Sequence, residues 1–463
     1  MNPELIARTM QHAQKYLDSL ATRPVRESAT QAELVAMLGG PLPEEGEDPI
    51  ATIDRLASAG EVGTVACSGP RYFGFVIGGS VPAAQAADWL TTTWDQNAGL
   101  YVISPVNSVA EDVSAQWLLD ILGLPATASV GYVTGGQAAN LTSLAAARNE
   151  LLRRVGWDVE QAGLQGAPKI HVVTSAESHV TIFNALRILG IGANTPKRVP
   201  ADAQGRMIAG ELRKVLATCD GPTIICAQAG NVNSGAFDPL DEIADIARLH
   251  GAWLHVDGAF GLWAAVSPKL RHFVRGIEKA DSWALDAHKW LNVPYDSGIA
   301  IVAHSEAHRR AFASMASYLQ PSSDKRDPHE WAPEFSRRAR GLAVWAAMRS
   351  LGRSGIRAMI ERSCEQARLF AELLSQDSRV KILNEVVLNQ TVVRFGDSDQ
   401  LTAAVIERVQ QDGTCWLSGT HWQGKGAMRI SVSNWMTTEE DVRRSCAAIL
   451  KALDAAARKA GAP

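Results

Sequence analysis

The sequence predicts an α/β fold: a mostly parallel central sheet, a smaller C-terminal α+β domain and an N-terminal helical arm. From about residue 125, short apolar runs alternate with helical stretches, which is typical of parallel α/β domains. These runs are almost continuously apolar, as expected for strands that are buried on both faces. After about residue 345, long helical stretches alternate with strand-like runs, which predicts the second, smaller domain.

The arm, residues 1–80, begins with a predicted helix. Its apolar residues fall near helical spacing: Leu5, Ile6, Met10, Ala13 and Leu17. A second short helix is predicted at Gln31–Leu38, where two glycines follow. Because so small a segment buries little surface alone, we expect it to pack on a partner subunit.

The two other domains are predicted at residues 81–347 and 348–463. The predicted strands of the large domain are Val130–Val133, Ile170–Val173, Thr223–Cys226, Trp253–Val256, Trp283–Leu285 and Ile299–Val302. Its predicted helices include Leu141–Arg153, Thr181–Leu189, Glu211–Ala217 and Leu240–His250. In the small domain, helices are predicted at Ser354–Leu374, Gln400–Gln411 and Glu439–Ala456, and strands at Val380–Leu383, Thr391–Phe395 and Met428–Val432.

Composition excludes several classes of protein. The chain has 463 residues, of which 46% are hydrophobic and 20% charged, so it is neither disordered nor collagen-like. Its net charge of −4 implies no strongly basic face, and we expect no nucleic-acid partner. No stretch approaches the roughly 18 apolar residues of a membrane span, and the N-terminus does not look like a secretory signal. The six cysteines have irregular spacing, so we expect free thiols, no metal site and a cytoplasmic location.

The segment Tyr132–Asn140 joins the end of a strand, a glycine pair and the start of a helix. Free N–H groups at a helix start form an anion site, and glycines allow close approach to the backbone, so a phosphate fits there. The spacing matches neither the dinucleotide-binding nor the P-loop motif. Taken alone, the segment is better explained as a plain strand-to-helix turn.

Three polar residues follow other apolar runs. Asp257 comes at the end of a strand, where a carboxylate can hold a cationic ring nitrogen, although alone it is better explained as the cap of a turn. Lys289 also follows a strand, and it is interpreted either as a buried, reactive amine that can form a Schiff base or as a surface lysine. His179 alone is typical of a hydrogen-bonded turn histidine.

The combination of these signals is more specific than any one of them. The glycine turn, His179, Asp257 and Lys289 follow one another in the chain, and the last two are 32 residues apart. Because the carboxyl ends of parallel strands meet at one edge of a sheet, all four are expected there.

With these residues the sequence resembles the group II pyridoxal-phosphate (PLP) decarboxylases, the family of aromatic-amino-acid and glutamate decarboxylases. The resemblance spans nearly the whole chain and includes Pro70–Gly74, Thr134–Asn140, His255–Phe260, His288–Trp290 and Ser336–Arg340. It implies PLP fold type I, the aspartate-aminotransferase fold, and a homodimer with active sites at the interface.

The resemblance also implies roles for individual residues. Lys289 would form the Schiff base with PLP, and Asp257 would pair with the protonated pyridine nitrogen. His179 would stack on one face of the ring, and Ala259 would pack on the other. The phosphate of the cofactor would be held by Gly136, Gln137 and His288, and Asn233 or Ser234 would lie next to it.

The implied reaction removes the carboxylate of an L-amino acid as carbon dioxide and leaves an amine. One alternative is an aldehyde synthase that releases ammonia and peroxide from the same site. Another is an aminotransferase of the same fold, in which Arg429 would bind a substrate carboxylate; a structural role explains this arginine equally well. A PLP-binding protein without turnover is a further class, against which the retained lysine, aspartate and histidine argue.

One expected residue is missing. Family decarboxylases often carry a mobile-loop tyrosine that delivers the final proton, and its expected position holds Pro328. His329 is the predicted replacement, because imidazole titrates near neutral pH, and the alternative is a solvent-exposed loop histidine. Tyr318 lies earlier in the same region. Loss of the tyrosine is what brings the aldehyde synthase into consideration.

The predicted substrate-pocket residues are Phe75, Ile77, Gly78 and Trp94. An apolar pair, Phe75 and Ile77, favours an apolar or aromatic amino acid over glutamate. The alternative is that these two are ordinary core residues.

Overall fold

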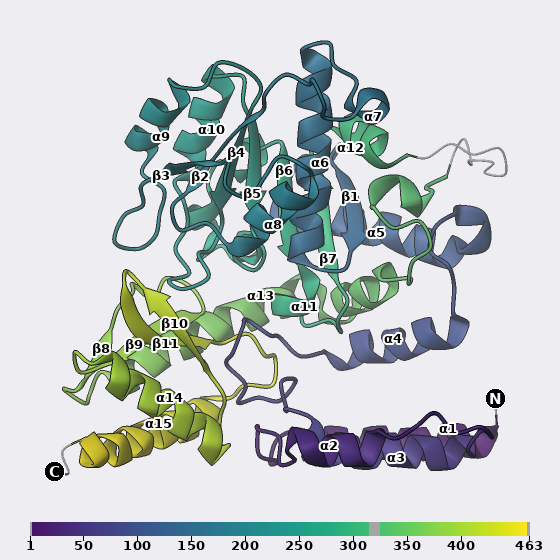
Figure 1. The fold of residues 1–463 in the computed structure, drawn as a ribbon, viewed down its shortest axis with the longest axis vertical. Helices are drawn as coiled ribbons and strands as arrows, with labels where there is room; N and C mark the ends of the chain where they lie inside the picture. Colours follow the sequence, from purple (N-terminus) through teal and green to yellow (C-terminus); the bar gives the residue numbers. More distant parts are fainter. Residues whose placement is uncertain (1, 314–324, 461–463) are drawn as a thin grey trace. The chain divides into compact units, whose positions relative to one another are not determined.

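The structure, a computed structural model, describes residues 2–313 and 325–460 (Figure 1). Tyr318, named above, lies outside the described residues. The described chain forms two compact units. The large unit consists of Gly78–Arg368 and Leu383–Thr391, and the small unit holds the residues up to Ile77, Leu369–Ile382 and those from Val392 onward. The predicted boundaries at residues 80 and 347 stay predictions.

A seven-stranded sheet forms the centre of the large unit, in the order β1-β7-β6-β5-β4-β2-β3. The strands are β1 (Ser129–Val133), β2 (His171–Ser175), β3 (Lys197–Val199), β4 (Thr223–Gln228), β5 (Trp253–Asp257), β6 (Ser282–Asp286) and β7 (Gly298–Val302). Strand β7 runs antiparallel to both of its neighbours, and the pairs from β6 to β3 are parallel. The predicted mostly parallel sheet is therefore confirmed.

Helices cover both faces of this sheet (Figure 1). Helix α6 (Gly136–Arg154) and α8 (Val180–Ile188) share a buried apolar cluster with Ile224 and Cys226 of β4. Helix α10 (Leu240–Leu249) also contacts β4 and β5 but contributes no residue to this cluster, since it lies on the other face. Every residue of β1, β2 and β4–β7 is buried, which explains their continuous apolar character.

The other helices of the large unit are shorter or lie at its periphery. They are α4 (Pro82–Trp94), η1 (Tyr101–Ile103), α5 (Pro105–Leu122), α7 (Val159–Ala162), α9 (Ala209–Leu216), η2 (Gly261–Val266), η3 (Arg271–Val274), η4 (Ile277–Lys279), α11 (Ala287–Trp290), α12 (Ser305–Phe312) and η5 (Pro328–Trp331). Helix α13 (Gly341–Leu374) begins in this unit and ends in the small one. It is interrupted at Gly352, whose φ of 61° is compatible with glycine but not with a helix.

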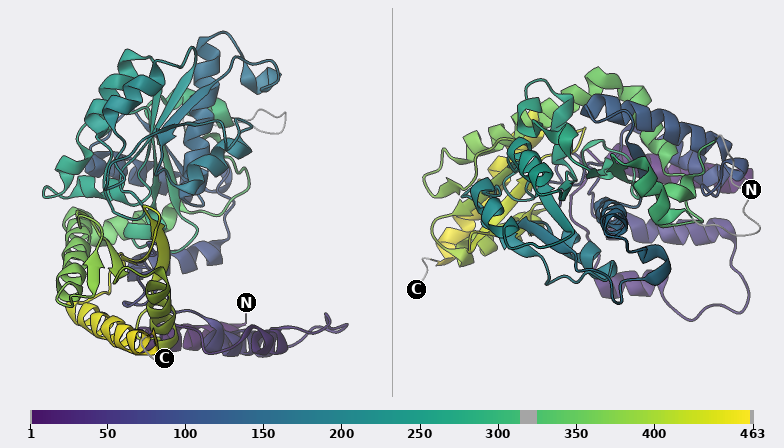
Figure 2. Two further views of the ribbon diagram at one scale, coloured as in Figure 1. Left: turned by 60° about the vertical axis from the view of Figure 1, so that its left-hand side comes forward. Right: turned by 90° about the horizontal axis from the view of Figure 1, so that it is seen from above.

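The small unit contains a four-stranded sheet in the order β10-β11-β9-β8. Its strands are β8 (Val380–Ile382), β9 (Gln390–Phe395), β10 (Ser418–Trp422) and β11 (Lys425–Ser431). Helices α14 (Asp399–Asp412) and α15 (Glu439–Ala460) pack together, and α14 lies against β10 and β11 (Figure 2). The predicted smaller α+β domain is thus confirmed in kind.

The N-terminal helices also belong to the small unit. They are α1 (Pro3–Ser19), α2 (Gln31–Leu38) and α3 (Pro49–Gly63). No residue described in α1 or α2 is buried, and both helices contact α3. The next segment pairs with the C-terminal part of the same unit, because Phe73 N–H donates to Trp416 O (2.7 Å) and Ser431 N–H donates to Phe73 O (2.9 Å).

Candidate active site

The four predicted motifs lie where strands of the large sheet end. The glycine pair Gly135–Gly136 follows β1, His179 follows β2, Asp257 is the last residue of β5, and Lys289 follows β6. These four strands point the same way, so their carboxyl ends bring the segments to one edge of the sheet. This is the edge at which α/β sheets bind ligands.

Asp257 is buried and receives two hydrogen bonds. The backbone N–H of Ala259 donates to its Oδ1, and Asn140 Nδ2 donates to its Oδ2, both at 3.2 Å. The first contact is the turn cap that a simple interpretation of this aspartate predicts. The second comes from α6 and holds the carboxylate from a different part of the chain.

His179 is the N-cap of α8 and is joined to Asp257 through two residues. Its Nδ1 lies 2.9 Å from Thr181 Oγ1 and accepts from Thr181 N–H at 3.4 Å. The same Thr181 hydroxyl accepts from Asn140 Nδ2 at 3.2 Å. The structure therefore connects His179 and Asp257, which are far apart in sequence, by a short series of hydrogen bonds.

Lys289 lies on the short helix α11, and only 20% of its side chain is exposed. It is therefore not the surface lysine on a loop of the alternative interpretation, and its Nζ lies 2.9 Å from Asp286 Oδ2. Asp286 was missed by the sequence analysis. Its carboxylate is buried, and its Oδ1 also accepts from the N–H of Gly136 at 2.5 Å. His288 Nε2 lies 3.3 Å from the same Asp286 Oδ1. An acid three residues before a lysine is the signal that predicts such a pair on a helical turn.

The glycine turn is closely packed against β6 and β7. A Cβ on Gly136 would lie 2.7 Å from Asp286 Oδ2, and a Cβ on Gly298 would lie 2.4 Å from Gly135 Cα. Only glycine allows this approach. The N-cap of α6, Gly135, makes no side-chain hydrogen bond, so apart from the Gly136 N–H that Asp286 accepts, the start of α6 is open to a ligand anion. Gln137, also predicted for the phosphate, is exposed and accepts from Asn184 Nδ2 at 3.4 Å.

His288 is buried and uncharged at neutral pH, because burial lowers its pKa. Its Nδ1 accepts from the N–H of Ser297 at 3.4 Å, which leaves the ring proton on Nε2, and the ring stacks on Tyr295. The Nε2–H therefore faces the carboxylate of Asp286, 3.3 Å away.

Ala259 and Asn233 occupy neighbouring loops. The carbonyl of Ala259 accepts from the N–H of Asp286 at 2.8 Å, which ties the ends of β5 and β6 together. Asn233 lies in the loop after β4, where its N–H donates to Asn231 Oδ1 at 2.9 Å. Its alternative, Ser234, donates its hydroxyl to Gln204 O at 2.6 Å.

Gly78 is the predicted substrate-pocket residue whose contact with Lys289 is direct. A Cβ on Gly78 would lie 1.7 Å from the Lys289 carbonyl oxygen, so the backbones touch at this point. Trp94 ends α4 and is exposed. Phe75 and Ile77 belong to the small unit, where the exposed Phe75 ring lies 5.4 Å from the ring of Trp416. Phe75 is therefore not the core residue of the alternative interpretation.

His329 lies in η5 and is only 5% exposed, so the alternative of a solvent-exposed loop histidine is wrong. Its Nδ1 lies 3.1 Å from Gly99 O and its ring lies beside Phe335. Neither of these contacts is with Lys289, Asp286 or the glycine turn.

The residues present fit a phosphorylated aldehyde cofactor. Two buried polar atoms near this edge have no hydrogen-bond partner among the described residues: Ser297 Oγ, next to His288, and Gln228 Nε2, whose residue pairs with Asp257 across β4 and β5. The other groups that PLP needs are also present: the amine of Lys289, the carboxylate of Asp257, the neutral ring of His288 and the start of α6.

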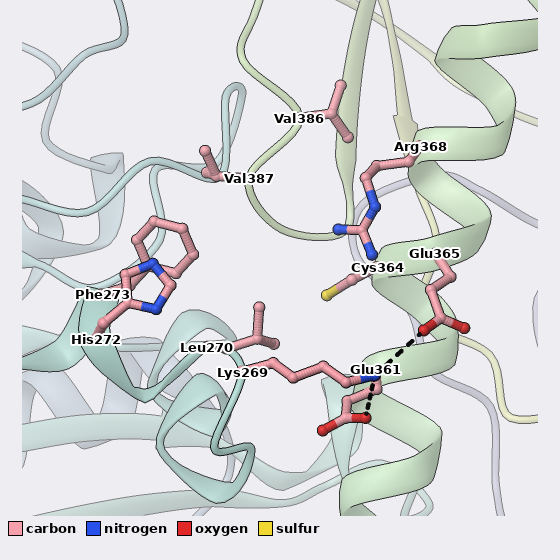
Figure 3. Close-up of a pocket in the computed structure, with 10 residues that line it drawn as sticks. All are labelled: Lys269, Leu270, His272, Phe273, Glu361, Cys364, Glu365, Arg368, Val386 and Val387. Carbon is pink, nitrogen blue, oxygen red and sulfur yellow. Dashed lines mark ion pairs between the residues drawn. The ribbon is translucent and has the colours of Figure 1, made fainter.

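A separate cavity of about 280 Å³ lies elsewhere in the large unit (Figure 3). Its lining includes Lys269, Phe273, Glu361, Cys364 and Arg368, and Lys269 pairs with Glu361 at 3.0 Å. It contains none of the predicted site residues.

Comparison with known proteins agrees with this assignment. The family described as "Pyridoxal-dependent decarboxylase conserved domain" matches residues 52–395. The chain is 27% identical over 443 residues to the aromatic-L-amino-acid decarboxylase of Bacillus atrophaeus, covering 92% of this chain and 90% of that protein. It is 26% identical over 447 residues to the 4-hydroxyphenylacetaldehyde synthase of Rhodiola rosea, covering 92% and 90%. The crystal structure of Oryza sativa TDC with PLP and tryptamine has a similar fold, with a TM-score of 0.91 at 23% identity, and 98% of this chain and 99% of that one are covered.

The fold and the site together define an enzyme of PLP fold type I. The chain belongs to the pyridoxal-dependent decarboxylase family. Its cofactor is pyridoxal 5′-phosphate and its enzyme class is that of the carboxy-lyases, so the predicted family, fold, cofactor and enzyme class are confirmed. Among the described helices, none is both long and apolar enough to cross a membrane.

Proposed function

We propose that this enzyme decarboxylates an L-amino acid to its amine, with Lys289 as the residue that carries the cofactor. The observation that supports the proposal most directly is the meeting of Lys289, Asp257 and the open start of α6 at one sheet edge. When bound, PLP supplies the electron sink for the electron pair left behind when carbon dioxide departs.

Different side chains would bind different parts of the cofactor. Lys289 Nζ is the amine that would hold the cofactor aldehyde, and Asp257 would hold the ring nitrogen through a charge-assisted hydrogen bond. His179 and Ala259 would pack on the two faces of the ring. The phosphate would be held at the start of α6, by Gly136, Gln137, His288 and Ser297, with Asn233 nearby.

Asp286 would keep Lys289 in place whenever its amine is not bonded to cofactor. The ion pair of 2.9 Å holds Nζ at the sheet edge, so the amine can accept and return a proton without leaving the site. Burial of Asp257 and Asp286 excludes water from the carboxylates that orient the reacting groups.

We further propose His329 as the donor of the final proton to Cα. Support comes from its ring chemistry and from its position next to Pro328, where the resemblance to the family implies a tyrosine. The variant His329→Asn keeps an N–H for Gly99 O but has no titratable ring. If His329 is the donor, amine formation by this variant falls at least about tenfold while thermal stability is kept. Unchanged amine formation would remove His329 from this role.

A second candidate function is oxidative. The 4-hydroxyphenylacetaldehyde synthase of Rhodiola rosea is a relative over most of both chains, and Pro328 stands where a tyrosine is expected. In that reaction the amino acid, dioxygen and water give an aldehyde, carbon dioxide, ammonia and hydrogen peroxide. Slow reprotonation at Cα would favour it.

We propose an aromatic substrate. The name of the Bacillus atrophaeus relative supports this class, as does the apolar character of Phe75 and Ile77. An acidic substrate would need a cationic partner for its side chain, and the predicted pocket residues supply none.

The experiment that tests the function is a product balance. The PLP-loaded protein is incubated in air with a panel of L-amino acids, and amine, carbon dioxide, ammonia and peroxide are measured together. Amine equal to carbon dioxide, without peroxide, is the expected result, greatest for aromatic substrates. Aldehyde with ammonia and peroxide would establish the oxidative reaction instead. Keto acid without carbon dioxide, when an acceptor is present, would contradict decarboxylation altogether.

We also propose a homodimer in the cytoplasm. All six cysteines are free, which supports a reducing compartment. Exposed apolar side chains on α4, η1 and α5 support a partner surface, as do those on the N-terminal arm. Deleting the arm is expected to weaken the dimer, and an unchanged dimer would refute its role.

A further inference from the structure

A continuous series of buried hydrogen bonds leads from Asp257 into the core of the large unit. Asn140 Oδ1 lies 2.8 Å from His255 Nε2, and His255 Nδ1 lies 3.0 Å from Ser282 Oγ. The indole Nε1 of Trp253 donates to the same Ser282 oxygen at 2.9 Å. Asn140, His255, Ser282 and Trp253 are all essentially inaccessible to solvent. None of them has a place in the reaction as described so far.

The chemistry of the end groups fixes the direction of every bond in this series. A carboxylate only accepts, so Asn140 turns its NH₂ group toward Asp257 and its carbonyl oxygen toward His255. His255 Nε2 must then carry the proton. Its Nδ1 accepts from the Ser282 hydroxyl, whose oxygen accepts from the indole of Trp253, a group that only donates.

The charge state of His255 agrees with this assignment. Burial lowers the pKa of His255 to about 3, so the ring is neutral and carries a single proton at neutral pH. With that proton on Nε2, the ring blocks rotation of the Asn140 amide. A rotated amide would place its NH₂ group against the His255 N–H and its oxygen against the Asp257 carboxylate, which are two repulsive contacts.

We propose that Asn140 is a positioning residue: it orients Asp257 toward the cofactor's ring nitrogen, and His255 holds Asn140 in the required orientation. The inference rests on the proposed function, in which Asp257 pairs with that nitrogen. Asn140 Nδ2 also donates to Thr181 Oγ1 at 3.2 Å, and this hydroxyl lies 2.9 Å from His179 Nδ1. The same amide group therefore contacts both Asp257 and the residue that is hydrogen-bonded to His179.

The test compares binding of two cofactors to the apoprotein: PLP, and its 1-deaza analogue, in which C–H replaces the ring nitrogen. The variant Asn140→Asp has the same size and still accepts from His255, but it presents an oxygen to Asp257 in place of a donor. We expect PLP affinity to fall about tenfold or more, since a hydrogen bond to a charged group is lost, and affinity for the analogue to change less than about twofold. An equal loss for both cofactors, or no loss for either, would overturn the proposal.

A pair of His255 variants tests the second half of the proposal and does not depend on the folding of the Asn140 variant. His255→Phe removes the N–H that faces Asn140, whereas His255→Gln keeps an N–H near the Nε2 position. We expect the phenylalanine variant to lose most of the preference for PLP over the analogue and the glutamine variant to keep it. Equal preference in the two variants would remove His255 from this role.

Asp257→Asn separates failure of this inference from failure of the proposed function. If Asp257 pairs with the ring nitrogen, this variant loses the preference for PLP over the analogue. If the preference persists in Asp257→Asn, the proposed role of Asp257 is wrong. If it is lost in Asp257→Asn but kept in Asn140→Asp, only the inference about Asn140 is wrong.

Discussion

Asp286 places a buried carboxylate between Lys289 and the start of α6, where the cofactor phosphate is proposed to bind. It accepts from the N–H of Gly136 and pairs with Lys289 Nζ. The phosphate carries negative charge, and two like charges close together in a buried site repel each other strongly. Asp286 therefore helps to hold the amine but opposes the anion.

We expect Asp286→Asn to strengthen PLP binding about tenfold, because one negative charge is removed while an oxygen remains for the Gly136 N–H. Titration of the apoprotein with PLP measures this change. Asp281→Asn is the matched control, since Asp281 lies just before β6, at its opposite end, and should change PLP affinity less than about twofold. Weaker PLP binding in Asp286→Asn would mean that the Lys289 pair outweighs the repulsion.

Among individual site residues, those that lie at the ends of strands could be predicted from the sequence. Lys289, Asp257, His179 and the glycine pair each follow an apolar run, so chain position alone brings them to one edge. Asn140 could not be found in this way, because its partners come from β5 and α8 and depend on how α6 packs. Hydrogen bonds between elements are set by packing and leave no periodic signal in the sequence.

His308 joins α12 to η5 inside the large unit. Its Nε2 lies 3.1 Å from Trp331 O and its Nδ1 lies 2.9 Å from Ser129 Oγ, so the neutral ring donates once and accepts once. Burial lowers its pKa from 6.5 to about 3. Below pH 6.5 the unfolded chain takes up a proton that the folded ring does not, so the stability present above this pH is lost as the pH falls toward 3.

We therefore expect the stability advantage of the wild type over His308→Gln to shrink on acidification. Glutamine keeps a donor for Trp331 O but does not titrate, so the difference in free energy of unfolding should fall by about 2 kcal/mol between pH 7 and pH 5. Urea titrations of both apoproteins at the two pH values measure it. Asp238, whose pKa burial raises to about 6, changes stability in the opposite direction but equally in both proteins. A difference that does not vary with pH would contradict the neutral, buried ring.

Strands of the large sheet were predictable where burial is complete and not where it is partial. The six predicted strands of the large sheet all form, because both faces are covered and every residue in them is buried. Strand β3 was missed, since Lys197-Arg198-Val199 is a charged edge strand, and β10 was missed because Ser418–Trp422 has little apolar character. Helix α13 begins before the predicted Ser354 because a further helical stretch, from Gly341, precedes the interruption at Gly352.

For the whole molecule, the proposal of a dimer is supported by the exposed apolar surface of η1 and α5. Val102, Ile103, Val106 and Val109 are all exposed there, and apolar side chains gathered in this way mark a protein interface. We expect Val106→Glu to shift the protein from dimer to monomer at micromolar concentration, because the charge would be buried in the interface. Light scattering after size-exclusion chromatography measures the mass.

The control for this experiment is Val155→Glu. Val155 is 50% exposed, compared with 51% for Val106, but it lies at the end of α6 and outside this surface. Its substitution should leave the mass of the dimer unchanged. A dimer that survives Val106→Glu would place the interface elsewhere.

For the whole chain, the order of the four motifs is enough to predict the family. The division of the chain into two structural units could not be predicted, because each unit combines segments that are far apart in sequence. The N-terminal residues up to Ile77 belong to the same unit as the C-terminal sheet, through contacts such as Phe73 with Trp416. Pairing over more than 300 residues of sequence has no local signal.

Chemical fixation of the bound cofactor shows directly whether Lys289 carries it. Borohydride reduction of the PLP-loaded protein attaches the cofactor permanently to the amine that holds it, and mass spectrometry of the digested protein locates the modified residue. We predict one phosphopyridoxyl group per chain, on Lys289, and none in Lys289→Ala. Stoichiometric modification of another lysine in the wild type would contradict it.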